Sequence, residues 1–257
     1  MGPTWLPTAA PEMSKETLIL LPGMMCDQRL FTPQIAILEK QYEIFVPSLN
    51  APDSIAGMAL RILDEINSPS FNLLGLSMGG IVAMNMVGLA PQRVSKLALL
   101  DTNHKTESVE RIAVRNRQIA DVKSGKLRTV IKDEMKPNYL AKSHRKNQAL
   151  LNLLINMAMD MGDEIFVAQS IALRDRADQT QTLQNYSGPS LVLCGDEDTM
   201  CPLGQHIQMA ECLSHSTFRM IKNCGHLSTL EQPDAVNIAL QEWLTRAVPQ
   251  LPALQPM

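Results

Sequence analysis

The chain has 257 residues, of which 45% are hydrophobic and 19% are charged, and it carries a formal net charge of −3. A chain of this length can bury a sizeable core, and the composition is that of an ordinary globular protein. Proteins that neutralise nucleic-acid phosphates show a basic excess, which this chain lacks. It also lacks a run of about eighteen apolar residues, the length a membrane span needs. We therefore expect neither a nucleic-acid nor a membrane partner.

The five cysteines are odd in number, and none of them stands in C-x-x-C spacing. This pattern predicts free, reduced thiols instead of a disulfide framework or a zinc site. The first dozen residues lack the basic and apolar stretches of a secretion signal. We therefore expect a cytoplasmic protein that holds no metal, with tails at residues 1–15 and at the Pro-rich stretch 247–257.

Short apolar runs alternate with amphipathic stretches over the first hundred residues. Strands are expected at 16–22, 42–49, 71–76 and 96–100, and helices at 32–41, 54–66 and directly after residue 77. Strands that alternate with helices form parallel sheets with right-handed crossovers and helices on both faces. The expected fold class is therefore α/β, with a mostly parallel, doubly wound sheet.

The pattern changes to helix after helix, with no convincing strand, from about residue 106 to residue 186. Sheet-forming runs then return at 191–194 and 218–221, with helices expected at 203–213 and 233–243. This order predicts a helical cap, residues 105–186, inserted into an α/β core formed by residues 16–104 and 187–246.

The most informative stretch is NLLGLSMGGIVAMNMVG, residues 72–88, in which a buried strand meets a helix with one serine at the corner. A serine on so sharp a turn holds a strained backbone, so Gly75 and Gly79 must carry no colliding side chain. The helix points its unpaired amides at Ser77, where an acyl-transfer oxyanion would form. Ser77 is therefore the candidate nucleophile. The alternative is a glycine-rich turn whose serine only caps the helix.

A nucleophilic serine needs a base, and the base needs an acid that holds its tautomer. Among the five histidines, His226 directly follows a strand and precedes a helix, so we expect it above the carboxyl edge of the sheet. The other four are expected to be solvated. Asp196 and Asp198 follow one strand and Asp101 follows another, so all three are candidate acids. One of the first two is expected to bind turn amides instead.

Two backbone amides are expected to hold the oxyanion. One is the N–H of Met78, which follows from the serine turn itself. The second is expected in the turn after the first strand, where Gly23 lets the chain turn back and Met24 N–H is the natural donor. The alternative interpretation of this segment is an ordinary tight turn.

The order Ser77, Asp198, His226, with the turn GLSMGG, the acid loop GDEDTMCP and the sequence NCGHLSTLEQP, resembles the α/β-hydrolase family. The resemblance is to the cap-bearing branch of serine hydrolases and carboxylesterases, and it covers the chain from about Thr17 to Trp243. It implies that Asp198 is the acid, because the family's G-x-x-D pattern maps to this position.

Two departures from the family pattern carry structural consequences. Pro22-Gly23 stands where the family often has His-Gly, so the support of the oxyanion loop must come from elsewhere. The stretch before Glu16 is too short for the family's usual first two strands, which implies a shortened sheet of about six strands.

The resemblance implies a serine hydrolase that cleaves small-molecule carboxylic esters without a cofactor or a metal. Dehalogenases and epoxide hydrolases of this fold resemble one another in using an aspartate nucleophile, so Ser77 argues against both. A thioesterase, a lactonase or a carbon–carbon bond hydrolase could use the same three residues. A cofactor-free lyase or dioxygenase, or a receptor that has kept them without activity, is a further alternative. The sequence leaves open whether the protein is a monomer or a dimer.

The cap and the core differ in charge. Residues 104–186 hold 14 basic and 10 acidic residues, a net +4, which leaves −7 for the remainder. A positive cap could attract a substrate that bears a carboxylate. The alternative is attraction between cap and core, or a solvated charged face.

Overall fold

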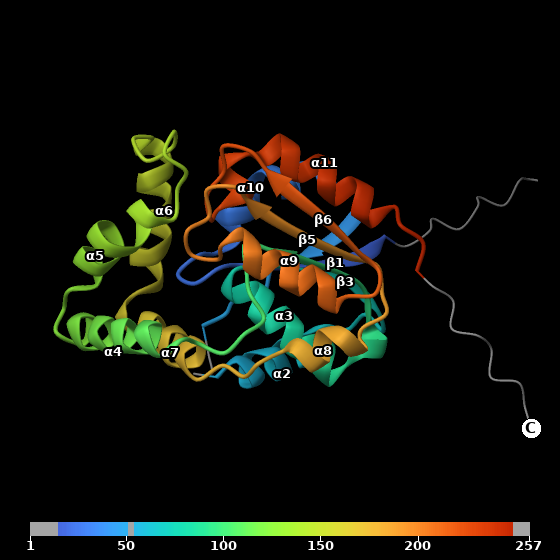
Figure 1. The fold of residues 1–257 in the computed structure, drawn as a ribbon, viewed down its shortest axis with the longest axis horizontal. Coiled ribbons are helices and arrows are strands. Elements are labelled where there is room, and N and C mark those ends of the chain that lie inside the picture. The colour runs from blue at the N-terminus through green and yellow to red at the C-terminus, as the bar shows by residue number, and fades with distance from the viewer. Residues whose placement is uncertain (1–14, 51–53, 249–257) are drawn as a thin grey trace, which may run out of the picture.

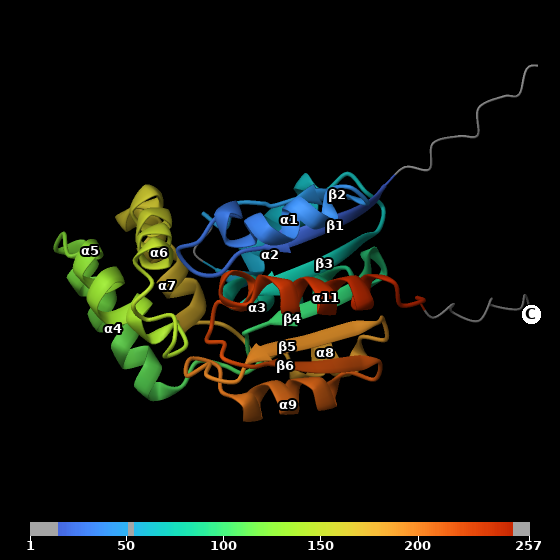
Figure 2. The ribbon, with the colours of Figure 1, turned by 90° about the horizontal axis from the view of Figure 1, so that it is seen from above.

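Six parallel strands form the centre of the computed structural model, which describes residues 15–50 and 54–248 (Figures 1 and 2). Their order across the sheet is β2-β1-β3-β4-β5-β6. The strands are β1 (Glu16–Leu21), β2 (Tyr42–Phe45), β3 (Phe71–Leu76), β4 (Val94–Leu100), β5 (Ser190–Gly195) and β6 (Ser216–Ile221). The predicted α/β class and the shortened sheet are confirmed. Most of the two expected tails, residues 1–14 and 249–257, lies outside the described residues.

The apolar runs decide which strands lie inside. All six residues of β3 are buried, and this strand pairs with β1 on one side and β4 on the other. Such a strand shows no alternation because both of its faces are covered by helices. The edge strands β2 and β6 are mostly half-buried, which agrees with their more polar sequences.

Helices cover both faces of the sheet (Figure 1). On one face lie α1 (Thr32–Leu38) and α11 (Pro233–Leu244), and on the other α2 (Ile55–Glu65), α3 (Met78–Leu89), α8 (Thr180–Asn185) and α9 (Leu203–Cys212). The short helices η1 (Gln28–Phe31), η2 (Pro91–Arg93) and α10 (Ser228–Glu231) belong to connections. Nine of the twelve residues of α3 are buried, so α3 is the central helix of its layer.

A helical lobe stands beyond the carboxyl ends of the strands (Figures 1 and 2). It comprises α4 (Val109–Lys123), α5 (Leu127–Thr129), η3 (Val130–Met135), η4 (Lys136–Asn138), α6 (Gln148–Met161) and α7 (Asp163–Arg174). The expected cap extended to residue 186. In the structure, α8 packs against α3 and α9 instead, because Leu183 is buried on that side. The part that stands over the sheet edge is therefore α4 to α7.

All five cysteines are free thiols, as predicted, and four of them are buried. Within the described ranges, every helix is too short or too polar to cross a lipid bilayer.

The tight contact under α3 predicts a stability effect. A methyl group at Gly79 would lie 2.0 Å from the Leu21 carbonyl oxygen, whereas one at Gly204 would meet no atom within 4 Å. We expect Gly79→Ala to lower the free energy of unfolding by roughly 1–3 kcal/mol or more, because backbone atoms must move apart. Gly204→Ala, the matched control, should be neutral or slightly stabilising. Urea unfolding of both variants measures this, and equal stabilities would contradict it.

Candidate active site

The turn between β3 and α3 holds Ser77 in a strained conformation. Its φ is 54° and its ψ is −116°, in a region that residues with a Cβ rarely adopt. The chain tolerates this because glycines flank the serine: a Cβ at Gly75 would lie 2.3 Å from the Gly79 carbonyl oxygen. The Thr102 hydroxyl donates to the Ser77 carbonyl oxygen at 2.7 Å and fixes the turn from β4. The serine hydroxyl is thereby presented at the sheet edge.

A chain of hydrogen bonds joins three segments that are far apart in the sequence. His226 Nε2 lies 2.9 Å from Ser77 Oγ, and His226 Nδ1 lies 2.8 Å from Asp198 Oδ2. An ionised carboxylate only accepts, so the Nδ1 proton points at Asp198 and Nε2 accepts from the serine hydroxyl. The imidazole is therefore oriented to take the serine proton.

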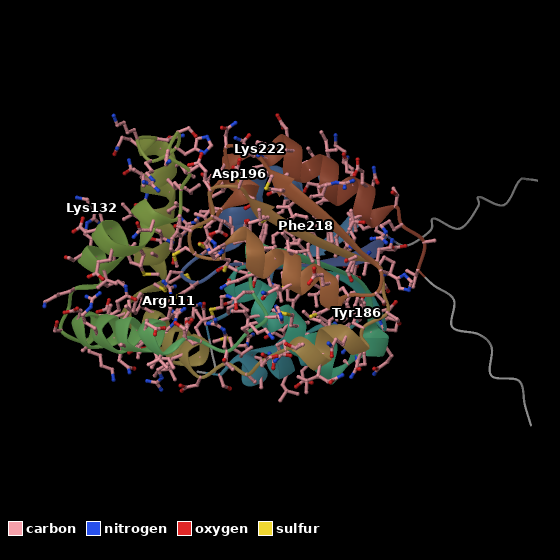
Figure 3. All side chains as sticks on the ribbon, viewed as in Figure 1. Arg111, Lys132, Tyr186, Asp196, Phe218 and Lys222 are labelled. Atoms are coloured by element: carbon pink, nitrogen blue, oxygen red, sulfur yellow. The ribbon has the colours of Figure 1, made fainter. Side chains whose placement is uncertain are left out.

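Asp198 is held in place by the loop after β5. Its Oδ1 accepts from the backbone N–H groups of Met200 at 2.8 Å and Cys201 at 3.0 Å, which leaves Oδ2 for the histidine. Asp196 binds a turn amide, that of Cys224, at 3.3 Å and pairs with Lys222 at 3.5 Å (Figure 3). The structure thus separates the two aspartates that the sequence left as alternatives.

The third candidate acid, Asp101, lies below the site. It is fully buried, and its two carboxylate oxygens accept from Gly195 N at 3.2 Å and Ser228 N at 3.1 Å. Burial, together with the Asp198 charge nearby, raises the pKa of Asp101 to about 8. Asp101 therefore ties the β5 loop to the histidine loop and does not touch the imidazole.

Burial and the ion pair act in opposite directions on the two central groups. Burial alone would raise the pKa of Asp198, but His226 and the backbone amide of Cys201 stabilise its charge and bring the pKa below the ordinary value. Burial alone would lower the pKa of His226, but the Asp198 carboxylate outweighs it and the pKa lies above the ordinary value. The site therefore stabilises an imidazolium beside a carboxylate.

The histidine loop is clamped from both sides. Glu231 Oε1 accepts from Gly225 N at 3.0 Å and Leu227 N at 3.2 Å, the residues on either side of His226. His226 N itself donates to the carbonyl oxygen of Tyr139 at 2.7 Å. Because Tyr139 follows the lobe helix η4, the lobe helps to position the imidazole.

The two amides expected to hold an oxyanion belong to segments that lie next to the serine side chain. Met78 is the first residue of α3, and neither its N–H nor that of Met24 donates to any acceptor in the described part of the chain. A Cβ at Gly23 would lie 3.5 Å from the Ser77 Cβ, so the Pro22–Met25 turn runs past the serine. The buried amide of Gln169, on α7, accepts from Met25 N at 2.8 Å and supports this loop. Two free N–H groups beside the serine can stabilise a negative oxygen.

A cavity of about 480 Å³ opens above these groups, between the sheet edge and the lobe. Ser77, His226 and Met24 line its floor, and Tyr139 and Arg115 belong to its wall. The space suits a small organic substrate whose reacting carbonyl lies at the serine.

A protein-family model described as the α/β-hydrolase fold matches residues 27–151, which include the strained serine turn. The chain belongs to the α/β-hydrolase fold family. Known proteins resemble this α/β hydrolase over most of its length. An (E)-2-((N-methylformamido)methylene)succinate hydrolase from Acinetobacter baylyi is 26% identical over 253 residues, which cover 89% of this chain and 90% of that protein.

Two further similarities extend this comparison. A thermophilic esterase from Thermogutta terrifontis, with malate bound, superposes with a TM-score of 0.79 at 27% identity, and the match covers 90% of both chains. A dihydrolipoyllysine-residue acetyltransferase component of an acetoin-cleaving system from Pseudomonas putida is 25% identical over 196 residues, or 76% of this chain. The match covers only half of that protein's length.

Two histidines are buried although the residues next to them in the sequence are polar. His104 and His206 are buried, and His206 Nε2 accepts from Thr102 N at 3.0 Å. The expectation that both are solvated is wrong, because tertiary packing covers them although their flanking residues are polar. Burial lowers the pKa of His206 to about 4, so this histidine is a neutral structural acceptor.

Only one group in the described ranges brings three metal-ligating side chains together, and it is Asp198, Cys201 and His226. Burial raises the pKa of the Cys201 thiol, which favours the protonated form that metals do not bind. The other two members already use their facing atoms on each other. These donors do not fit a metal ion.

The ion pair predicts a specific dependence of activity on pH. His226 must be neutral to accept a proton, so kcat/KM on a neutral ester should rise with pH, with a midpoint above the ordinary imidazole value of 6.5. Asp198→Asn removes the carboxylate that outweighs burial, and the smaller effects of Asp101 and Lys136 oppose each other, so the midpoint should move below that of the wild type and kcat should fall roughly 10⁴-fold. Asp196→Asn is the matched control and should keep the wild-type midpoint. An unchanged profile in Asp198→Asn would contradict the assignment.

Proposed function

We propose that this α/β hydrolase cleaves carboxylic esters through an acyl-enzyme intermediate, with Ser77 as nucleophile, His226 as base and Asp198 as the acid that orients it. The observation that carries the proposal is the continuous hydrogen-bonded chain from the strained serine through His226 to a carboxylate. A serine that only capped α3 would accept from its amides, and the Ser77 side chain makes no such bond.

Acylation follows from the positions of these groups. Ser77 Oγ attacks the ester carbonyl while its proton passes to His226 Nε2, and the carbonyl oxygen takes the electron pair of the π bond. The free amides of Met24 and Met78 hold that oxyanion. When the tetrahedral intermediate collapses, the C–O bond to the alcohol breaks and His226 returns its proton to the leaving oxygen.

Deacylation repeats the same steps with water. His226 Nε2 takes a proton from a water molecule, which attacks the acyl carbon, and the Ser77 oxygen leaves with the proton that the histidine returns. The products are a carboxylic acid and free enzyme. No step needs a cofactor, because both proton transfers use one imidazole.

The relatives support hydrolysis and leave the kind of bond open. One is an esterase and one is a hydrolase of a succinate derivative. A thioester, a lactone or an activated carbon–carbon bond could be cleaved by the same steps, with a thiol, a tethered alcohol or a carbanion as the leaving group. Parallel assays on an ester, a thioester and a lactone of the same acyl group would rank them.

Kinetics on a short-chain 4-nitrophenyl ester test the proposal. We expect a burst of nitrophenol equal to the enzyme concentration, because an activated 4-nitrophenyl ester acylates the serine faster than water releases the acid. Ser77→Ala and His226→Ala should each lower kcat by roughly 10⁴- to 10⁶-fold, since residues that act as a unit lose nearly everything when one is removed.

The same two variants separate the competing classes. A lyase or dioxygenase that uses only the imidazole would lose far more activity from His226→Ala than from Ser77→Ala. A receptor would show binding and no turnover in the wild type. Gln205→Ala, which changes another residue of the cavity lining, is a control for general damage to the cavity.

A further inference from the structure

A buried cluster of three charged side chains lies in the wall of the cavity. Arg115 Nε donates to Glu107 Oε2 at 2.5 Å, and Arg176 Nη1 lies 2.9 Å from the same oxygen. The three side chains are 10%, 5% and 5% exposed for Arg115, Glu107 and Arg176. Two guanidinium groups share one carboxylate, so the cluster carries a net charge of +1. A buried excess charge is costly unless an anion compensates it.

Each of the three side-chain nitrogens of Arg176 already donates to an oxygen of the protein, and four of its five N–H groups are used in this way. Its Nε donates to the Lys105 carbonyl oxygen at 2.8 Å and its Nη1 to that of Leu173 at 3.2 Å. Its Nη2 donates to Asn103 Oδ1 at 3.4 Å. All three nitrogens are used within the protein, so the role of Arg176 is to hold Glu107 and the chain around it.

Arg115 differs because its terminal nitrogens are free of oxygen acceptors. Nη1 meets only the sulfur of Met24, at 3.7 Å, and Nη2 has no partner in the described part of the chain. A guanidinium presents its donors in a fork that matches a carboxylate. Met24 also supplies one of the two proposed oxyanion donors and lines the same cavity as Ser77. The open side of Arg115 is therefore one methionine side chain away from the proposed oxyanion site.

Arg111 strengthens the positive end of the cavity. It stands one turn before Arg115 on α4, lines the same cavity, and its side chain makes no hydrogen bond or ion pair with the described residues. Figure 3 places it where α4 approaches the sheet. Like charges four residues apart on a helix repel each other, and an anion between them would remove that repulsion.

The acidic residues of the cavity wall are already paired. Glu107 is held by the two arginines, and Glu134 accepts from Arg117 Nη2 at 2.6 Å. Neither carboxylate is available to neutralise Arg111. Among the described residues, this end of the cavity therefore offers the arginines no further carboxylate, and the anion of a ligand could take that place.

We propose that Arg115, with Arg111 beside it, binds a free carboxylate of the substrate, so that the enzyme acts on monoesters of small dicarboxylic acids. The inference rests on the proposed ester hydrolysis for its chemistry and on the arginines for its selectivity. The carboxylate accepts from the Nη groups of Arg115 at one end of the cavity while the ester carbonyl lies at Ser77. The excess of positive charge in the lobe then reflects a defined binding site.

Matched substrates test the selectivity. We expect wild-type kcat/KM to be roughly 10- to 100-fold higher for mono-4-nitrophenyl adipate than for its neutral methyl ester, as hydrogen bonds to a charged group predict. Arg115→Gln should remove this preference, Arg115→Lys should keep part of it, and Arg111→Gln should reduce it severalfold. Glu107 stays paired with Arg176 in the Arg115 variants, and thermal melting checks that they fold.

Arg128→Gln is the matched control, because this arginine of α5 is exposed and its loss changes the lobe charge by the same amount. The preference should survive in this variant and at high salt. If the wild type cleaves both esters equally, or if the preference survives in the Arg115 and Arg111 glutamine variants, the inference is wrong while the proposed function stands.

Calorimetry on Ser77→Ala keeps the two proposals separate. This variant should bind monomethyl adipate more tightly than dimethyl adipate, and the further change Arg115→Gln should abolish the difference. Arg115-dependent binding without turnover in the wild type would refute the ester hydrolysis and retain the carboxylate site. Equal binding of the two compounds would overturn the carboxylate site.

Discussion

The structure depends on the close approach of two backbones beneath Ser77. The first turn of α3 passes so near the end of β1 that only hydrogen fits at Gly79, where a methyl group would lie 2.0 Å from the Leu21 carbonyl oxygen. Next to this contact the serine has a positive φ, and the loop after β1 passes close to the serine side chain. The proposed nucleophile and the proposed oxyanion site thus depend on the same packing of α3 against the end of β1.

Two buried acids hold the loops of the proposed site in place. Asp101 joins the β5 and β6 loops, and Glu231 holds the amides on both sides of His226. The lobe contributes as well, since Gln169 supports the oxyanion loop and Tyr139 accepts from the histidine amide. The lobe is therefore part of the site's framework in addition to forming its roof.

The sheet and the serine turn could be predicted from the sequence, because both leave a local pattern. The buried strands are short apolar runs, and the strained turn requires glycines at fixed spacing from Ser77. The position of His226 at the carboxyl edge of the sheet could also be predicted, because this residue lies in the loop that follows a strand. The side chains that support these loops could not be predicted. Gln169 bonds to a loop far away in the sequence, and nothing in the residues around Glu231 indicates that it holds the amides beside His226. Pairing across the fold also decides the burial of His206 and the position of α8. The positive charge of the lobe can be counted in the sequence, but most of the oxygens that surround Arg176 and leave the Nη groups of Arg115 open come from segments far away in the chain.

The central claim is that Ser77 is a nucleophile activated by His226. Treatment with a fluorophosphonate followed by peptide mass spectrometry tests it most directly, since this reagent reacts with activated serines and needs no knowledge of the substrate. The account predicts one adduct per chain, on the peptide that contains Ser77, and loss of labelling in His226→Ala. An adduct on another residue, or labelling of Ser77 that persists at full rate without the imidazole, would contradict it.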